Sequence, residues 1–150
     1  TSWETGPQLS PNGRWLVYQS SEPNSEVEVF VRRFPSSERT YQVSVDGGRS
    51  AQWSHDGTEI FYWGVDEAED SGVAKVVSFS VREGTPVLGR PQTLVPFDIS
   101  LIGNSANYSV ASDGRFLLIK GTPDSLLEKA QALVYPDRIR VATNWRASIR

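Results

Sequence analysis

The sequence predicts an all-β protein built from a repeated small sheet, and three observations support this. A short phrase in which a turn leads into an apolar strand occurs as residues 10–18, 54–62 and, more loosely, 111–119. The copies start 44 and 57 residues apart, a repeat length typical of propellers and solenoids. Aromatic residues, which favour strands, make up 11% of the chain, and helical signals are scarce. Because four strands joined by tight turns form one propeller blade, we expect about three blades, a partial propeller or half-ring.

The first expected blade spans about residues 8–46. Val27, Val29 and Val31 alternate with larger or charged residues, which is the period of two that a strand requires. Turns rich in proline, asparagine and serine separate four strands. We place these strands at residues 8–10, 15–20, 27–32 and 41–45.

The second expected blade spans about residues 51–96 and has the same order. Its strands are expected at residues 51–54, 59–63, 74–81 and 92–95, with an acidic loop at residues 65–72 before the third strand. The last blade, about residues 107–145, looks incomplete. We expect its strands at residues 107–110, 115–120 and 138–143, with a short helix at residues 125–133 inside an insertion.

Each repeat begins with an Asn-Gly or Asp-Gly turn. Glycine accepts a positive φ, and the Asx side chain can bond the nearby backbone, so these residues are predicted to be structural. The repeat-turn residues are Asn12, Gly13, Asp56, Gly57, Asp113 and Gly114. The apolar residues that follow should alternate into the core between blades; they are Leu16, Tyr18, Ile60, Tyr62, Leu117 and Ile119.

Composition excludes several function classes. The net charge of −3 is too small to steer nucleic acid, and the chain has no long basic run. No cysteine is present, so disulfides, thiolate chemistry and cysteine-ligated zinc are excluded. No apolar run is long enough to cross a bilayer. We therefore expect no nucleic-acid partner, no membrane insertion and no cofactor.

Ser54, His55 and Asp56 have the residue types of a catalytic triad but are consecutive in the chain. A triad needs a histidine that contacts both the nucleophile and the carboxylate, which adjacent residues in one turn do not provide. We interpret His55 as a turn residue and predict that this segment is not an enzyme, with no catalytic residue.

Two groups of carboxylates are candidates for metal binding or acid–base chemistry. The Asp66–Asp70 loop offers oxygen ligands for a cation, although its spacing fits no EF-hand, and the sequence leaves this open. Glu26 and Glu28 lie on one face of a predicted strand, as paired carboxylates do in glycosidases. The neighbouring arginines 32–33 favour ion pairs on an exposed strand instead.

The five tryptophans could form a stacking platform for sugars or peptides. Trp15 and Trp53 fall at repeat positions, so we expect them to pack between blades. Trp3 and Trp63 lie at element ends, where neither interpretation is favoured.

Several phrases resemble a known family. Residues 10–15 and 53–57 resemble WD-like β-propeller repeats of the TolB type. Longer stretches are similar to the C-terminal propellers of bacterial serine/threonine protein kinases and related multidomain proteins. These stretches are residues 28–35, 42–48, 52–54, 59–62, 89–94, 108–110, 113–117 and the near-terminal Asn144-Trp145. The resemblance covers most of residues 8–145, but His55 replaces a usual proline, and the acidic loop and the insertion at residues 122–135 depart from the pattern.

The resemblance implies a non-catalytic scaffold for a protein or peptide partner. It would be the C-terminal portion of a TolB-like propeller from a larger bacterial protein, an interaction or sensor domain of a kinase for example, in a periplasmic or extracytoplasmic location. One alternative is the substrate-gating propeller of a prolyl-oligopeptidase-type serine peptidase, although no Gly-x-Ser-x-Gly elbow is present. Another is a half-propeller that closes its ring as a homodimer, since bare blade faces and strand edges favour association with a second copy or with the missing blades.

Overall fold

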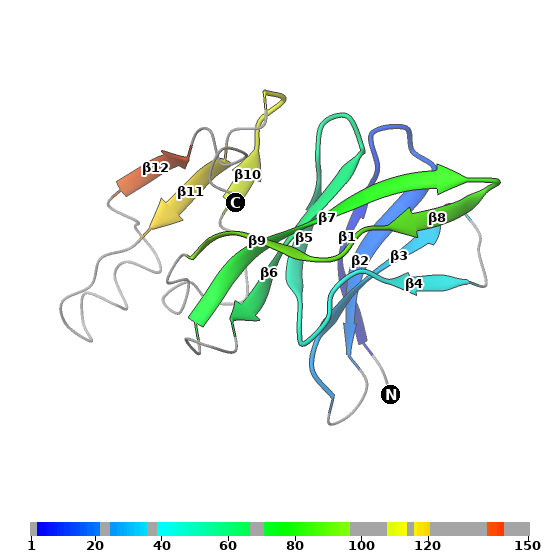
Figure 1. Cartoon of the computed structure of the whole chain (residues 1–150), viewed down its shortest axis with the longest axis horizontal. Helices are drawn as coiled ribbons and strands as arrows, with labels where there is room; N and C mark the ends of the chain where they lie inside the picture. Colours follow the sequence, from blue (N-terminus) through cyan, green and yellow to red (C-terminus); the bar gives the residue numbers. More distant parts are fainter. Residues whose placement is uncertain are drawn as a thin grey trace.

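The computed structural model of the chain describes residues 3–21, 25–35, 39–66, 71–96, 108–113, 116–120 and 138–142. Every regular element among them is a strand, and the strands form three antiparallel sheets arranged one after another (Figure 1). This confirms the predicted all-β class and the blade-like sheets. Across these ranges no helix has the length and apolar character that would let it cross a membrane.

The first sheet contains β1 (Trp3–Leu9), β2 (Trp15–Ser21), β3 (Glu28–Arg33) and β4 (Thr40–Gln42), in this order. The sequence placed its first strand at residues 8–10, and this was wrong, because the strand begins at Trp3, opposite Ser21. Glycine and proline are uncommon inside strands, and they occupy positions 6 and 7. The structure accommodates them in a bulge between Thr5 and Gln8.

The second sheet contains β5 (Arg49–Trp53), β6 (Glu59–Asp66), β7 (Ser71–Arg82) and β8 (Thr85–Leu88), and β9 (Gln92–Pro96) also pairs with β7. The ends of the expected acidic loop belong to strands, because the ladder between β6 and β7 continues until Asp66 lies opposite Ser71.

Strand β8 is an element that sequence analysis missed. Glu83 and Gly84 both have positive φ, 50° and 79°, and form the tight turn of a β7–β8 hairpin. This hairpin reaches over the first sheet (Figure 1), and Leu88 packs against the core between the first two sheets. A Glu-Gly pair is a weaker turn signal than Asn-Gly, which explains the omission.

The third sheet contains β10 (Tyr108–Val110), β11 (Phe116–Lys120) and β12 (Arg138–Ala142). These strands agree with the expected positions to within one residue. The expected helix at residues 125–133 and the Asn144-Trp145 pair lie outside the described residues.

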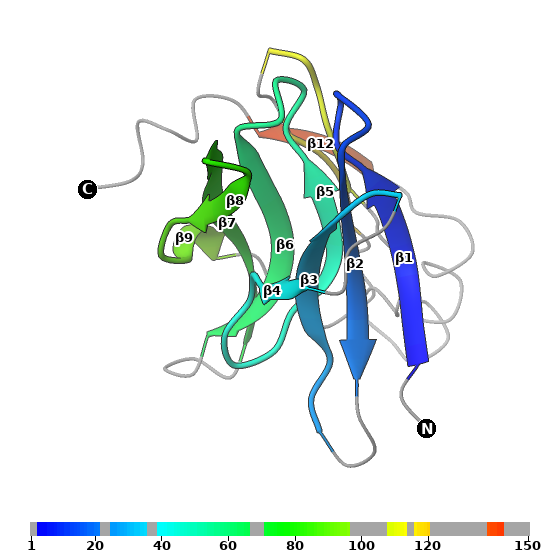
Figure 2. The same ribbon diagram turned by 90° about the vertical axis from the view of Figure 1, so that its right-hand side faces the viewer.

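The main core lies between the first and second sheets. It joins Trp15, Val17, Val29, Val31 and Val43 to Ala51, Trp53, Ile60, Tyr62, Val77 and Phe79. A smaller core between the second and third sheets contains Phe61, Ala74, Val76, Leu94 and Tyr108. Figure 2 shows β1 and β2 running alongside β5 of the next sheet, the arrangement that the main core requires.

The predicted alternation into the core between blades holds for Ile60 and Tyr62. Tyr18 is buried, but it lies on the other face of the first sheet and belongs to neither core. Leu16 is only partly buried, because its face of the first sheet is turned away from the second sheet. The side chains at positions 117 and 119 lie outside the described residues.

Candidate functional site

The turn of the first repeat is held by its own serine and asparagine. The Ser10 hydroxyl donates to Asn12 Oδ1 at 2.9 Å, and the backbone N–H of Arg14 donates to the same oxygen at 3.0 Å. The N–H of Trp15 donates to Ser10 Oγ at 3.0 Å, and Gly13 has a φ of 68°. The side chains of Ser10 and Asn12 thus supply hydrogen-bond partners for the backbone of the tight turn that precedes β2.

The second repeat reproduces these bonds. Ser54 Oγ donates to Asp56 Oδ1 at 2.7 Å and accepts the N–H of Glu59 at 2.9 Å, while Gly57 has a φ of 71°. Both the N–H and the hydroxyl of Thr58 donate to Asp56 Oδ1. The carboxylate therefore contacts Ser54 directly, and His55 is an exposed residue between them.

These donors stabilise the ionised form of Asp56. Hydrogen bonds from the Ser54 side chain, first, and from Thr58, second, hold the pKa of this carboxyl below its ordinary value. The arrangement strengthens the turn and offers the carboxylate no histidine to orient.

The third repeat lacks the serine hydroxyl of the first two. Asp113 lies in the turn after β10, but Ala111 stands where the other repeats have Ser10 and Ser54. The hydroxyl that accepts an N–H in the first two repeats is therefore absent here, and Gly114 lies outside the described residues.

Two glutamines join consecutive inner strands, and sequence analysis missed both. Gln8 Oε1 accepts the N–H of Trp53 at 2.8 Å, and Gln52 Nε2 donates to the carbonyl of Tyr108 at 2.7 Å. The two glutamines are 44 residues apart, each two positions before the serine of its repeat. The same position of the two glutamines relative to the repeat was the available signal in the sequence. It was missed because the repeated segment was defined as starting at residues 10 and 54, after the glutamines.

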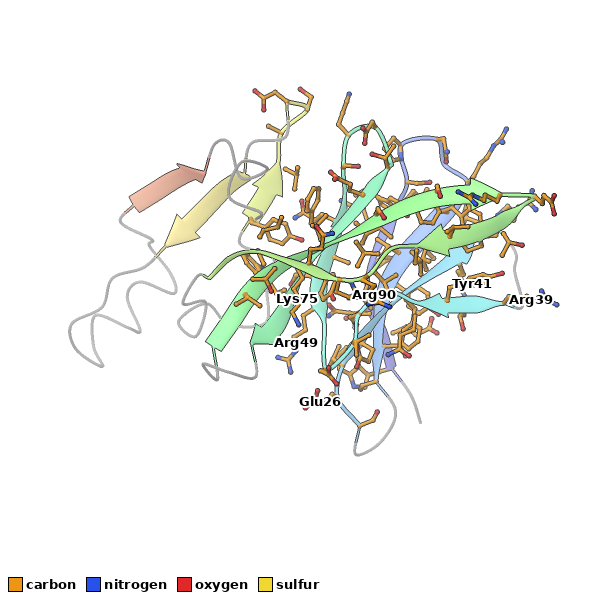
Figure 3. All side chains as sticks on the ribbon, in the orientation of Figure 1. Glu26, Arg39, Tyr41, Arg49, Lys75 and Arg90 are labelled. Atoms are coloured by element: carbon orange, nitrogen blue, oxygen red, sulfur yellow. The ribbon has the colours of Figure 1, made fainter. Side chains whose placement is uncertain are left out.

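Glu28 is held by the turn that leads into the second sheet. Its carboxylate accepts hydrogen bonds from the hydroxyl of Ser44 and, at 3.0 Å, from the N–H of Gly47. Arg32, one of the two arginines expected to pair with these carboxylates, lies over the ring of Tyr18, 5.2 Å from its centroid. Glu26 is exposed at the start of the segment (Figure 3).

Two buried tyrosines lie at the junctions between sheets. The hydroxyl of Tyr108 donates to the carbonyls of Ser50 at 2.6 Å and Phe61 at 3.2 Å, and burial raises its pKa. The hydroxyl of Tyr62 is buried without a hydrogen-bond partner among the described residues. Burial, and then the negative charge of Glu28, raise the pKa of Tyr62, so both phenols stay neutral at physiological pH.

The tryptophans divide as their positions suggested. Trp15 and Trp53 are 5% and 7% exposed and lie in the core, which confirms the packing prediction. Trp63 meets Tyr108 edge-on with ring centroids 4.8 Å apart. Trp3 is 47% exposed and is the most exposed of these four tryptophans. Trp145 lies outside the described residues.

No group of three or more histidine or acidic side chains is gathered for metal binding in the part of the chain that the structure describes. Asp66 ends β6, and positions 67–70 of the expected acidic loop lie outside that part. Figure 3 places the basic residues Arg49, Lys75 and Arg90 on or beside the second sheet. Lys75 crosses Gly64, where an added Cβ would lie 2.8 Å from the lysine Cδ.

Comparison with solved structures completes this description. The chain is similar to the crystal structure of TolB from Acinetobacter baumannii, with a TM-score of 0.57 and 19% sequence identity. The similarity covers 80% of this chain and 27% of the TolB chain. The chain has the fold of part of a TolB-like β-propeller. No protein-family model and no curated protein matches the sequence.

A propeller arranges its blades around a central channel. Here the first strands of consecutive sheets contact one another, which places them on the inner side of the blades. In this propeller segment, these strands are β1, β5 and β10. The hydrogen bonds of Gln8 and Gln52 thus join consecutive blades at their inner strands. All seven residues of β1 are exposed, and Trp3 lies at one end of this inner-strand surface.

Proposed function

We propose that this propeller segment is a non-catalytic scaffold that binds a protein or peptide at its inner strands. The observation that carries the proposal is the exposed indole of Trp3 at the end of the inner strand β1. Large exposed aromatic side chains anchor peptides, because they bury much apolar area at a low entropic cost.

The polar residues of the repeats support a scaffold rather than an enzyme. Ser54 and Asp56 hydrogen-bond to each other and to the backbone of their own turn. Gln8 and Glu28 hold neighbouring strands and turns. Each of these groups has a structural partner that accounts for its position.

The resemblance of residues 28–35 and 89–94 to bacterial kinase propellers supports a finer proposal. The segment would belong to a larger, extracytoplasmic bacterial protein, and any kinase chemistry would lie in another part of that protein. The aligned part makes up only 27% of the TolB chain, so the activity of any larger protein that contains this segment is also a proposal.

The test is a selection of random-sequence peptides on the immobilised chain, with Trp3→Ala and Phe34→Ala as matched variants. Both side chains are exposed, at 47% and 43%, and they lie at opposite ends of the first sheet. We expect an enriched peptide family whose binding is lost in Trp3→Ala and kept in Phe34→Ala, as measured by calorimetry. Failure to enrich any family, or equal binding by both variants, would contradict the proposal.

A further inference from the structure

One face of the first sheet has no sheet packed against it in the described part of the chain. We call it the front face and define it by Leu9, Leu16, Tyr18, Phe30 and Arg32. Strand register places these residues together, since Leu16 lies opposite both Leu9 and Arg32, and Tyr18 lies opposite Phe30. Alternation turns them away from Val17 and Val31, which face the second sheet.

The front face is apolar but incompletely buried. Leu9 is 45% exposed, and Leu16 and Phe30 are partly exposed. Tyr18 is covered by side chains of its own sheet. The ring of Phe30 lies beside it, with the ring centroids 6.0 Å apart, and Arg32 lies over its ring. An exposed apolar sheet face of this kind marks a site of interaction.

The second sheet shows what such a face packs against. The 44-residue spacing makes Trp53, Ile60 and Tyr62 the equivalents of Leu9, Leu16 and Tyr18. Their exposures are 7%, 0% and 1%, because the first sheet covers them. The covering surface is the back face of the first sheet, formed by Trp15, Val17, Val29 and Val31.

The equivalence extends to an aromatic wedge. The N–H of Phe34 donates to the carbonyl of Arg14, and the N–H of Phe79 donates to that of Thr58, which is 44 residues further on. Phe79 fits between Trp15 and Trp53, with ring centroids 5.4 and 4.9 Å away. Phe34 has the same backbone position and is 43% exposed.

Backbone donors complete the comparison. The second sheet donates the N–H groups of Ser50 and Trp53 to the glutamines at positions 19 and 8 of the first sheet, both at 2.8 Å. The equivalent donors in β1 are Gly6 and Leu9. Gly6 and Ser50 even share the left-handed backbone, with φ of 61° and 54°, so β1 has the shape that the second sheet uses for docking.

We propose that the front face docks the back face of a further four-stranded sheet of this repeat type, from outside residues 1–150. Small β-branched side chains of that sheet would cover Leu16, an aromatic ring at the position of Trp15 would pack against Phe34, and a glutamine Oε1 would accept the N–H of Leu9. This surface shares Gly6 and Leu9 of β1 with the inner-strand surface but does not include Trp3, and the inference does not depend on peptide binding at Trp3.

A second copy of this chain is a poorer occupant. The back faces of its first and second sheets are already buried against the next sheet. Its third sheet has Ser109 at the position of Gln8 and Gln52, and serine is too short to bridge two blades as glutamine does.

The first experiment extends the full chain at its N-terminus with a copy of residues 1–44, which reproduces the native repeat spacing. Amide hydrogen exchange of Leu9 reports docking, and that of Trp53 reports that the chain itself is folded. We expect exchange at Leu9 to slow by roughly tenfold or more on extension, because an exposed donor becomes a buried bond. An extension with Gln8→Ala in the added copy should lose this protection. Unchanged exchange at Leu9, with Trp53 still protected, would overturn the proposal.

A second experiment uses the unextended chain and holds whether or not the extended one folds. Leu16→Asn should leave the urea midpoint nearly unchanged, whereas Ile60→Asn, at the equivalent covered position, should lower it strongly. Equal losses would mean that the front face is already covered within the chain, which contradicts the proposal. Light scattering, combined with the same exchange assay, tests whether a second copy of the chain covers the front face. A dimer in which the Leu9 amide is protected would make the second copy the occupant and would overturn the proposal.

Discussion

Trp53 of the second sheet donates two hydrogen bonds to Gln8 of the first sheet. Gln8 Oε1 accepts the N–H of Trp53 at 2.8 Å, and the indole Nε1 of Trp53 donates to the carbonyl of Gln8 at 3.2 Å. The ring of Trp53 then continues into the core and meets Phe79 edge-on. Trp53 therefore joins the two blades by its hydrogen bonds to Gln8 and by its place in the core between the sheets.

The Gln8→Ala variant should destabilise the chain by about 1–3 kcal/mol, because it leaves the N–H of Trp53 in a buried strand without an acceptor. The measurement is urea unfolding followed by tryptophan fluorescence. Gln42→Ala, which removes an exposed glutamine from β4, is the matched control and should change little. Equal effects of the two variants would show that the bridge contributes nothing to stability.

The sequence predicted the parts of this fold that depend on local chemistry. Asn-Gly and Asp-Gly turns and alternating valines act over a few residues, so β2, β3 and β6 were placed almost correctly. The burial of Trp15 and Trp53 followed from their repeat positions. These features need no knowledge of what lies on the other side of the sheet.

The parts that the sequence missed depend on distant partners. Nothing within Gln8 or Gln52 reveals which backbone group of the next blade it will meet. Glu28 reads as a surface charge until Ser44, 16 residues later, donates to it. The inner-strand contacts could therefore be recognised only once the blades were placed side by side.

Because of Asp56, the free energy of unfolding should depend on pH in the acidic range. Its folded-state pKa is lowered, so the stabilisation is present above the ordinary carboxyl value of about 3.9 and is lost as the pH falls through the lower folded value. The Asp56→Asn variant keeps the Oδ1 acceptor but cannot titrate. We expect wild type to be the more stable protein at pH 6, with the difference shrinking toward pH 2, as measured by urea unfolding across this range.

The first repeat offers the reciprocal control, because it has Asn12 where the second has Asp56. Asn12→Asp should add an acid-dependent contribution of the same sign, with the same donors from Ser10 and the Arg14 backbone. A pH profile that is unaltered by both changes would contradict this assignment.

Ala111→Ser should stabilise the third repeat by about 0.5–1.5 kcal/mol, the net contribution of one added hydrogen bond. In the first two repeats, the serine hydroxyl accepts the N–H of the residue five positions later and donates to the Asx side chain. Asp113 supplies that Asx side chain in the third repeat. Slower amide exchange in β10 and β11 would support the expectation, whereas the same exchange in wild type and variant would contradict it. Ser10→Ala should produce the opposite change in the first repeat.

Phe79 and Phe34 occupy equivalent backbone positions, and their truncation should have very different effects. Phe79→Ala removes a ring that contacts both Trp15 and Trp53, so we expect a loss of about 3–5 kcal/mol, as for other large core truncations. Phe34→Ala removes a ring that is 43% exposed and should cost at most about 1 kcal/mol. Both are measured by urea unfolding of the unextended chain.

The contrast between these two variants tests for a covering sheet, which supplies Trp15 at Phe79. Within its own sheet, Phe34 also has the smaller Leu9 where Phe79 has Trp53. Residue type, backbone hydrogen bond and repeat position are the same at both sites. If Phe34→Ala were as costly as Phe79→Ala, the first sheet would have to be covered by another part of this chain or by a second copy. If it is nearly neutral in the unextended chain and costly once residues 1–44 are added in front, the covering sheet itself supplies the missing stability.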